Sequence, residues 1–223
     1  MEYLKFKHPF TCIIAGITGS GKTVWTRNLL ENYKYLIDIK VHRLHVLWCY
    51  GQEQDIYNIP IKNVDISYHK GIPNLETIKN SKPNIIILDD LMLELKNDEN
   101  IKNLFIKGSH HLKISVIYIT QNIFQTDKSM RTISLNSQYI VIMKGIRITQ
   151  QIQHLGNQIY PRKSTKFINI FKHATIKPFS YLLLDLHPAS DDKYRLRNRI
   201  FREELPKHLK SIYYSAPIFY PID

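Results

Sequence analysis

Cysteine is scarce in this chain of 223 residues, and long apolar runs are missing from it. Its two cysteines, Cys12 and Cys49, lie in short apolar stretches and form no Cys-x-x-Cys pattern, so neither a disulfide framework nor a thiolate metal site is expected. No apolar run reaches the roughly 20 residues of a membrane-spanning helix, and the first ten residues lack the apolar segment of a signal peptide. We therefore expect neither membrane insertion nor secretion.

Acidic residues are also few: 19 Asp and Glu stand against 31 Lys and Arg, which gives a formal net charge of +12. This balance favours a polyanionic partner, and nucleic acid is the first to consider. Zinc-finger spacing, an RNA-recognition aromatic motif and a helix-turn-helix signature are all lacking, so sequence-specific reading of DNA is not indicated. Apolar residues make up 43% of the chain, which is enough for a buried core.

Short runs rich in Ile and Val alternate with longer polar or amphipathic stretches. This alternation predicts an α/β fold, a three-layer sandwich around a mainly parallel sheet, with edge strands or a β-hairpin towards the C-terminus. The expected strands cover residues 10–15, 44–49, 85–88, 116–119, 139–143 and 181–186, with a shorter one near 64–68. The expected helices cover residues 22–33, 91–107, 149–158 and 164–173.

The chain shows no repeat and no Gly/Ser linker. We therefore expect one domain over residues 1–205 and a loosely docked tail over residues 206–223, where three prolines occur.

The strongest motif follows the first expected strand and opens the first expected helix, where the sequence matches G-x-x-x-x-G-K-[ST]. Its residues are Gly16, Ile17, Thr18, Gly19, Ser20, Gly21, Lys22 and Thr23. In such a loop, backbone N–H groups curl around phosphate oxygens and the helix N-terminus adds a favourable dipole. The motif predicts an ATP site in which Lys22 reaches the β- and γ-phosphates and the Thr23 hydroxyl ligates Mg²⁺.

Two acidic residues, Asp89 and Asp90, end the apolar stretch at residues 85–88. This arrangement is typical of a Walker B element, in which Asp89 would bind the Mg²⁺ shell and Asp90 would orient or deprotonate the attacking water. Asp90 has an alternative role as the N-cap of the following helix. Glu94 is the reserve candidate for water activation, with a solvated helix face as its alternative.

A third apolar stretch, at residues 116–119, ends in Thr120, Gln121 and Asn122. Gln121 is therefore a candidate sensor of the γ-phosphate, or else a loop residue that bonds to nearby backbone groups. The three polar positions follow three expected strands, so the carboxyl-edge crevice of an open α/β sheet would hold them together.

Several motifs together resemble the genome-packaging ATPases of the FtsK-HerA superfamily. The resemblance is to the type encoded by Polinton/Maverick elements and adenovirus-like or adintovirus-like viruses, with poxvirus packaging ATPases as more distant relatives. It spans about residues 10–203 and rests on motifs at 16–23, 87–92, 109–111, 119–124, 131–134, 151–161 and 181–186. It implies a homo-oligomeric ring that hydrolyses ATP to pump double-stranded DNA into a capsid, docked on a capsid vertex protein. It also implies a location where virions assemble, in the host nucleus or cytoplasm or within the virion.

The sequence departs from this family at residues 144–149, where an Asn-Pro-Arg-Asp run is replaced. Arg147 keeps the basic position, and Arg147 and Arg131 are our candidates for an arginine finger that reaches a neighbour's γ-phosphate. Each has a subunit salt bridge or a solvated position as its alternative. For the pair His110-His111 we favour a structural or coupling role over a metal site, because no third ligand is evident.

Contacts with DNA are less clearly marked. On a strand over residues 193–202, Arg195, Arg197 and Arg199 would share one face, which would line DNA, line a subunit interface or simply face water at a sheet edge. The alternative pore candidates are Lys62, Lys70, Lys79 and Lys82.

Two other functions compete with the motor. One is a P-loop nucleotide kinase, against which stand the missing Arg-rich lid and the acidic pair suited to water. The other is a nucleotide-gated adaptor that binds DNA or capsid protein and hydrolyses little.

Overall fold

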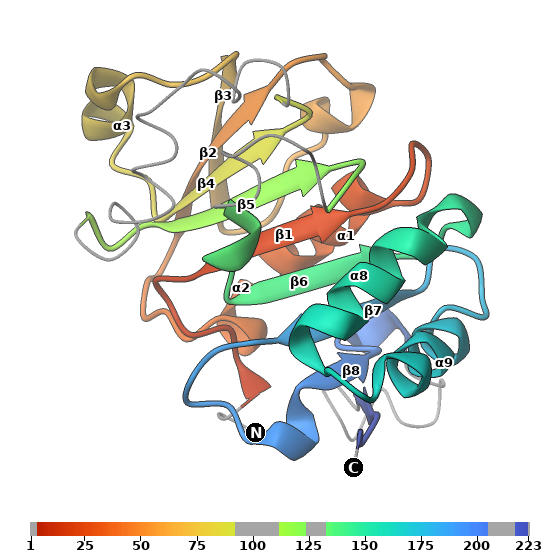
Figure 1. Cartoon of the computed structure of the whole chain (residues 1–223). Coiled ribbons are helices and arrows are strands. Elements are labelled where there is room, and N and C mark those ends of the chain that lie inside the picture. The colour runs from red at the N-terminus through yellow and green to blue at the C-terminus, as the bar shows by residue number, and fades with distance from the viewer. Residues whose placement is uncertain (1–3, 92–111, 124–132, 205–216, 223) are drawn as a thin grey trace.

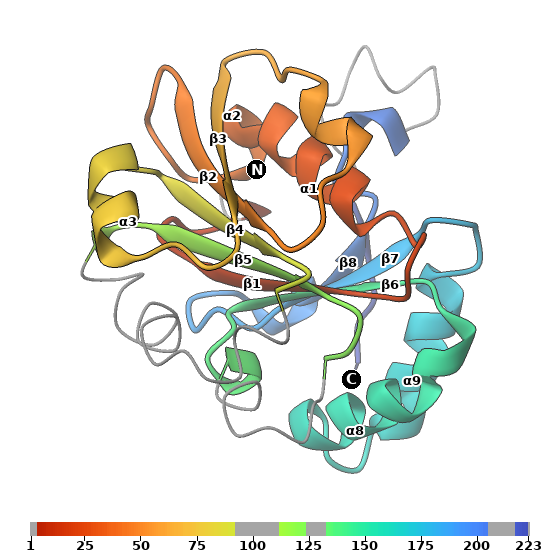
Figure 2. The same ribbon diagram turned by 90° about the horizontal axis from the view of Figure 1, so that it is seen from above.

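The computed structural model describes residues 4–91, 112–123, 133–204 and 217–222. Within them, a nine-stranded sheet has the order β3-β2-β4-β5-β1-β6-β7-β8-β9, with helices on both of its faces (Figures 1 and 2). The strands are β1 (Thr11–Ala15), β2 (Leu44–Tyr50), β3 (Val64–Lys70), β4 (Ile85–Asp89), β5 (Ser115–Thr120), β6 (Tyr139–Met143), β7 (Tyr181–Asp185), β8 (Leu196–Asn198) and β9 (Ile218–Phe219). The α-helices are α1 (Lys22–Glu31), α2 (Tyr33–Leu36), α3 (Leu75–Ser81), α8 (Thr149–Ile159) and α9 (Ser164–Ala174).

The first six strands in the sheet order, β3, β2, β4, β5, β1 and β6, are all parallel to one another. Every residue of β1, β4, β5 and β6 is buried, as the continuous apolar runs predict for strands covered on both faces. The last three strands are antiparallel and extend the sheet beyond β6. The expected three-layer α/β architecture with C-terminal edge strands is thus confirmed.

Two hydrophobic cores lie on opposite faces of the sheet because successive side chains of a strand point to opposite sides. In β1, Cys12 and Ile14 join the core beneath α1 and α2, whereas Ile13 and Ala15 join the core beneath α3, α8 and α9. Both cysteines are buried and unpaired. In the part of the chain that is described, no helix combines the length and apolarity needed to cross a membrane.

Most expected elements agree with the structure to within a few residues, but some do not. The helix α3 was not anticipated, although Asn74 caps it by accepting from the Thr77 N–H at 2.7 Å. Most of the helix expected at residues 91–107 lies outside the described residues. Of the expected tail, residues 217–222 are described, and β9 pairs with β8. The division of the chain near residue 205 stays a prediction.

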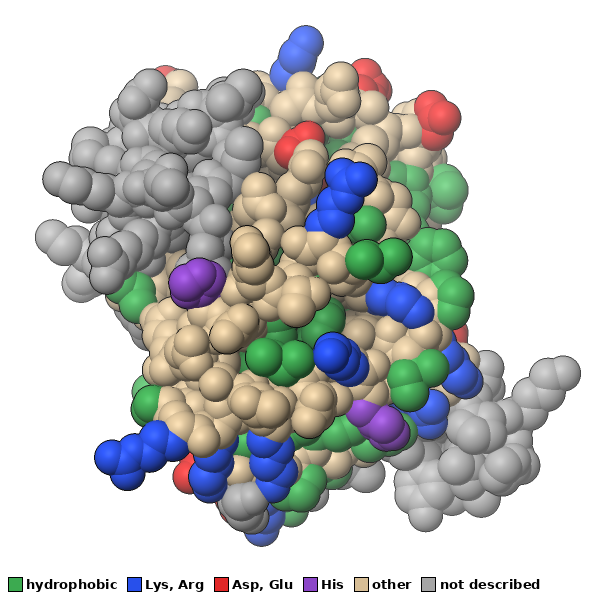
Figure 3. Space-filling view, turned by 45° about the vertical axis from the view of Figure 1, so that its right-hand side comes forward, with side chains coloured by type: hydrophobic (Ala, Val, Ile, Leu, Met, Phe, Trp, Pro, Cys, Tyr) green, Lys and Arg blue, Asp and Glu red, His purple; other side chains and the backbone are tan. Residues whose placement is uncertain are grey.

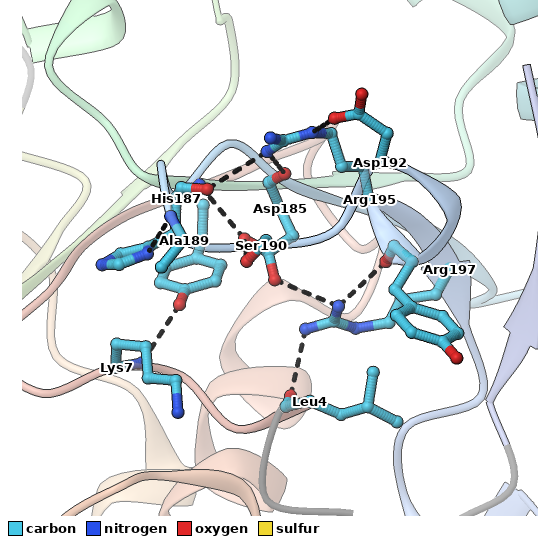
Figure 4. A network of polar contacts seen from close by, with 11 residues as sticks. Leu4, Lys7, Asp185, His187, Ala189, Ser190, Asp192, Arg195 and Arg197 are labelled. Atoms are coloured by element: carbon cyan, nitrogen blue, oxygen red, sulfur yellow. Dashed lines mark hydrogen bonds and ion pairs between the residues drawn. The ribbon is translucent and has the colours of Figure 1, made fainter.

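The expected basic stripe along residues 193–202 is wrong. The strand β8 is covered on both faces, so Arg197 is only 1% exposed and pairs at 3.1 Å with Asp185, which is equally buried. Figure 4 shows the Arg197 guanidinium held between Asp185 and the Leu4 carbonyl. Arg195 bonds to Asp192 and to the Asp185 and His187 carbonyls, and Arg199 lies beyond β8. Arg195 and Arg197 therefore bond within the fold, and the three arginines form no common row on one face of a strand.

The buried pair predicts a large stability effect. Arg197→Ala would leave the Asp185 carboxylate buried without its countercharge, which typically costs about 3–5 kcal/mol. The matched control is Arg43→Ala, because Arg43 pairs with Asp65 at 2.9 Å where both side chains are solvent-exposed; we expect it to cost about 1 kcal/mol or less. Urea unfolding of both variants measures the difference, and equal losses would contradict this account of the pair.

Candidate active site

The loop between β1 and α1 has the shape of a phosphate cradle. Gly16 is buried, and a Cβ added there would lie 2.7 Å from Met143 Cβ and 2.7 Å from Ser20 Oγ. Gly21 has φ +94°, a left-handed conformation that favours glycine. Helix α1 has no side-chain cap and no acidic residue in its first turn, so its first N–H groups are left available to an anion.

Lys22, the first residue of α1, is folded back onto this loop. Its Nζ donates to the Gly16 carbonyl at 2.7 Å and to the Ile17 carbonyl at 3.1 Å. Burial lowers the pKa of Lys22, and the nearby carboxylates of Asp89 and Asp90 partly oppose that shift. The two carbonyls hold the ammonium group beside the position where phosphates would bind.

Asp89 ends β4 and is only 3% exposed. Burial raises the pKa of Asp89 to about 6, while a hydrogen bond from Tyr57 and the positive charge of Lys22 act in the opposite direction. The Tyr57 hydroxyl donates to Asp89 Oδ2 at 2.9 Å. A buried carboxylate without such a donor would be more costly still.

Tyr57 is a site residue that the sequence motifs did not identify. It lies in the 3₁₀-helix η2 (Asp55–Asn58), where its ring packs against Trp48, Tyr50 and Tyr68 at centroid distances of 5.4, 5.5 and 5.0 Å. The Tyr68 hydroxyl also bonds to the Tyr57 carbonyl at 2.9 Å. No spacing rule links Tyr57 to Asp89, 32 positions away, and only the aromatic content of this stretch could have hinted at the contact.

Asp90 is exposed and has φ +54°, a left-handed conformation that aspartate tolerates better than most residues. Its N–H donates to the Ile119 carbonyl at 3.4 Å, so the backbone stays bonded to β5 one residue beyond the end of β4. The helix that Asp90 was alternatively expected to cap lies outside the described residues, as does Glu94.

Gln121 follows β5 and is exposed at the same edge of the sheet. A backbone hydrogen bond of 3.2 Å from Gly16 N to the Thr120 carbonyl ties the phosphate loop to the end of β5. The neighbouring Asn122 is turned towards α8 instead, where Gln151 Nε2 donates to its Oδ1 at 2.8 Å. Gln121 is thus the amide left beside the phosphate loop.

One cavity, of about 860 Å³, brings most of the expected residues together. Its size is within the range of small-molecule sites. The expected residues that line it are Thr18, Gly19, Gly21, Lys22, Thr23, Asp89, Asp90 and Gln121. Aromatic and apolar side chains also line the cavity, namely Trp25, Met143, Phe179, Tyr181 and Phe201, together with the carboxyl groups of Glu203 and Glu204, and the sequence motifs did not anticipate this part.

Magnesium fits the oxygen donors in this cavity. Thr23 offers a hydroxyl, and Asp89 and Asp90 offer carboxylates. Among the described residues, no cluster of three His, Cys, Asp or Glu side chains could hold a metal by itself. Mg²⁺ is usually bound through one or two carboxylates together with substrate phosphates and water, and the hydroxyl of Thr23 and the two carboxylates are donors of that kind.

Of the two expected arginine fingers, the structure describes only Arg147. Arg147 lies exposed in η4 (Ile146–Ile148) and is absent from the cavity wall. Arg131 and the pair His110-His111 lie outside the described residues. The alternative pore candidates, Lys62, Lys70, Lys79 and Lys82, are all exposed. Figure 3 shows Lys and Arg side chains scattered over the described part of one face of the molecule, and they outnumber the acidic side chains there.

No protein-family model matches this sequence, and no curated protein sequence matches it either. Solved structures do resemble it. The DNA-packaging ATPase B204 of Sulfolobus turreted icosahedral virus superposes with a TM-score of 0.53 at 12% identity, over 81% of this chain and 94% of that chain. The genome-packaging NTPase B204 of Sulfolobus turreted icosahedral virus 2 gives 0.51 at 13% identity in complexes with AMP (79% and 92% covered) and ATP-gammaS (80% and 93%).

These likenesses show the fold, a P-loop NTPase sandwich with a large and mostly parallel sheet.

Burial of Asp89 predicts the effect of Asp89→Asn in the absence of nucleotide and Mg²⁺. Because the folded pKa of about 6 lies above the unfolded value, ionised Asp89 destabilises the fold at pH 7, and the variant should be more stable by about 2–3 kcal/mol. As the pH falls through 6 towards 4, wild-type Asp89 takes up its proton in the fold and the difference should vanish. Urea unfolding at pH 7, 6, 5 and 4 measures the difference in unfolding free energy between the two proteins. A variant that is less stable than wild type at pH 7 would contradict a raised pKa for Asp89.

Proposed function

We propose that this chain is an ATPase whose hydrolysis drives double-stranded DNA into a viral capsid. The observation that carries the proposal is the convergence of Lys22, Thr23, Asp89, Asp90 and Gln121 on one cavity, at the carboxyl ends of the parallel strands β1, β4 and β5. A phosphate cradle alone is common to many nucleotide-binding proteins. The carboxylate pair and the amide beside it are the parts that suit water as the nucleophile.

Binding of ATP would begin at the loop and the N-terminus of α1, whose free N–H groups meet the phosphates. Lys22 would exchange its bonds to the Gly16 and Ile17 carbonyls for bonds to the β- and γ-phosphates. A bound Mg²⁺ would supply charge neutralisation of the phosphates, held by Thr23 and Asp89. The Tyr57 hydroxyl occupies Oδ2 of Asp89 and orients the carboxylate for that contact.

Hydrolysis requires a water in line with the γ-phosphate. Asp90 is exposed in the cavity wall and would hold this water and accept its proton, with Glu94 as the reserve base. Gln121 would contact the γ-phosphate, and loss of that phosphate would shift the loop after β5. Gln151 in α8 is hydrogen-bonded to this loop, at Asn122 and at the Ile123 N–H. That path leads from the reacting phosphate to a helix on the far side of the sheet.

A second subunit would complete the site. Lys22 is the only basic side chain among the described residues of the cavity wall, although the phosphates of ATP carry several negative charges. Arg147 is exposed and outside its own chain's cavity, which suits a residue that acts on a neighbour's γ-phosphate; Arg131 remains the other candidate. A ring is the closed arrangement in which every subunit both receives and donates such an arginine.

The partners follow from the same proposal. The net charge of +12 and the spread of basic side chains favour contact with DNA phosphates without base reading. A capsid vertex protein would dock the ring, at the site of virion assembly in the host nucleus or cytoplasm. The motif series at residues 87–92, 109–111 and 119–124 supports the Polinton and adenovirus-like type in particular.

Steady-state ATPase activity with and without linear duplex DNA tests the motor. We expect Mg²⁺-dependent hydrolysis that DNA stimulates, and a fall of about a hundredfold or more for Lys22→Ala and for Asp89→Ala, because each loses an interaction with transition-state charge. Lys172→Ala, which removes an exposed charge from α9, is the control and should match wild type. Phosphate transfer to a nucleoside monophosphate would instead indicate a kinase, and binding without turnover an adaptor.

Mixing two inactive variants tests the shared site. Lys22→Ala and Arg147→Ala should each be inactive alone, because every site of a pure ring lacks one of the two cations. Mixed rings contain some sites with both, so activity should reappear on mixing and pass through a maximum near equal proportions. If mixing restores nothing while Arg131→Ala complements Lys22→Ala, the finger is Arg131; if neither arginine variant complements, the shared site is wrong.

A further inference from the structure

Phe179 is an exposed aromatic residue held in an unfavourable backbone conformation. It lies in the turn between α9 and β7, its surface is 68% exposed, and its φ is +58°. A bulky side chain in the left-handed region raises the free energy of the fold, and such residues gather at functional sites when the surroundings impose the conformation.

The surroundings do impose it here. Two donors from Ser180, its N–H and its hydroxyl, bond to the Lys177 carbonyl and close the turn. Lys144, the residue after β6, bonds to the same turn twice, from its N–H to the Ser180 carbonyl at 2.8 Å and from Nζ to the Ile176 carbonyl. The backbone around Phe179 is therefore fastened on both sides.

The Phe179 ring lies against the phosphate loop. A Cβ added to Gly21 would be 3.4 Å from Phe179 Cδ1 and 3.6 Å from Met143 Cε. Phe179 also belongs to the apolar wall of the nucleotide cavity, together with Tyr181 and Phe201. Its exposed ring thus forms part of the wall of the same cavity that Asp89 and Asp90 line.

The strand order gives a bound nucleotide its direction. Asp89 and Gln121 lie on β4 and after β5, to one side of β1, whereas Met143 and Phe179 lie on β6 and before β7, to the other side. Consider a nucleotide whose terminal phosphate lies between Lys22 and Asp89. If its ribose extends towards the aromatic side chains of the cavity, its base lies at Phe179.

From this geometry we propose that Phe179 is the stacking platform for the purine base of the bound nucleoside triphosphate. The inference rests on the proposed function, since it assumes that the cavity binds a nucleotide, and it adds the part of the site that recognises the base. A base covers the exposed ring and stacks through its π-face, which requires no particular hydrogen-bonding edge. Phe179 would therefore contribute affinity with little selection among bases.

The test compares a ligand with a base and one without. Calorimetric titrations with Mg²⁺ would use ATP and inorganic tripolyphosphate, which shares the phosphates alone. Phe179→Ala should weaken ATP binding about tenfold or more, and should leave tripolyphosphate binding unchanged. Phe179→Tyr keeps a stacking ring and should retain wild-type affinity for ATP.

Two further variants test whether a general change in the turn or in stability could explain weaker ATP binding. Ile176→Ala removes an exposed apolar side chain from the same turn without touching the nucleotide cavity, and it should bind ATP like wild type. Phe179→Gly relieves the left-handed strain, so its thermal midpoint should equal or exceed that of wild type while its ATP affinity falls as in Phe179→Ala.

The outcomes separate this inference from the proposed function. If wild type binds and hydrolyses ATP but Phe179→Ala binds it equally well, the stacking role is wrong and the ATPase stands. If Phe179→Ala weakens ATP and tripolyphosphate alike, or changes only the oligomeric state, Phe179 supports the loop or a neighbouring copy and the stacking role is again wrong. If wild type binds neither ligand, both proposals fall.

Discussion

The burial of one carboxylate beside a phosphate loop is the constraint on which the rest of this structure depends. Asp89 is 3% exposed, and burial raises its pKa to about 6. This shift above the usual value of an aspartate means that the ionised form is unfavourable in that position. A Tyr57 hydrogen bond and the nearby Lys22 charge offset part of that cost. A magnesium-nucleotide complex would offset much more, so a site that is costly when empty favours its ligand.

The parallel sheet is what keeps these groups together. Backbone hydrogen bonds join the ends of its strands, from Gly16 to Thr120, from Gly51 to Asp89 and from Asp90 to Ile119. Each links a loop that carries a site residue to a neighbouring strand, so these bonds hold the loop after β1, the Asp89–Asp90 pair and the end of β5 beside one another. The antiparallel strands from β7 onward extend the other side, where the Asp185–Arg197 pair fastens the edge and the turn with Phe179 borders the cavity.

Much of this arrangement could be predicted from the sequence because it rests on local patterns. Continuous apolar runs indicated the buried strands. The motif from Gly16 to Thr23 and the acidic pair at the end of an apolar run indicated the polar half of the site. The basic stripe at residues 193–202 failed for a definite reason. Alternation on a strand predicts two faces but not whether either meets solvent, and all three residues of β8 are buried. Arg197 is consequently an internal partner of Asp185.

The residues that sequence reasoning missed act through contacts between distant segments. Tyr57 reaches Asp89 across 32 positions, and Phe179 meets Gly21 only because α8 and α9 return the chain to the sheet at β7. No motif marks either residue, since a lone tyrosine in a loop and a Pro-Phe-Ser turn are common. The polar half of the site follows from a motif, whereas the aromatic half follows from the fold.

The central claim is that Lys22 and Asp89 serve a single magnesium-nucleotide complex. A double-mutant cycle on the affinity for Mg²⁺-ATP, with Lys22→Met and Asp89→Asn alone and together, tests it most directly. We predict that the double variant loses clearly less binding free energy than the sum of the two single losses, because either change already disrupts the shared complex. Strictly additive losses would mean that the two residues act on separate ligands, and would contradict the account.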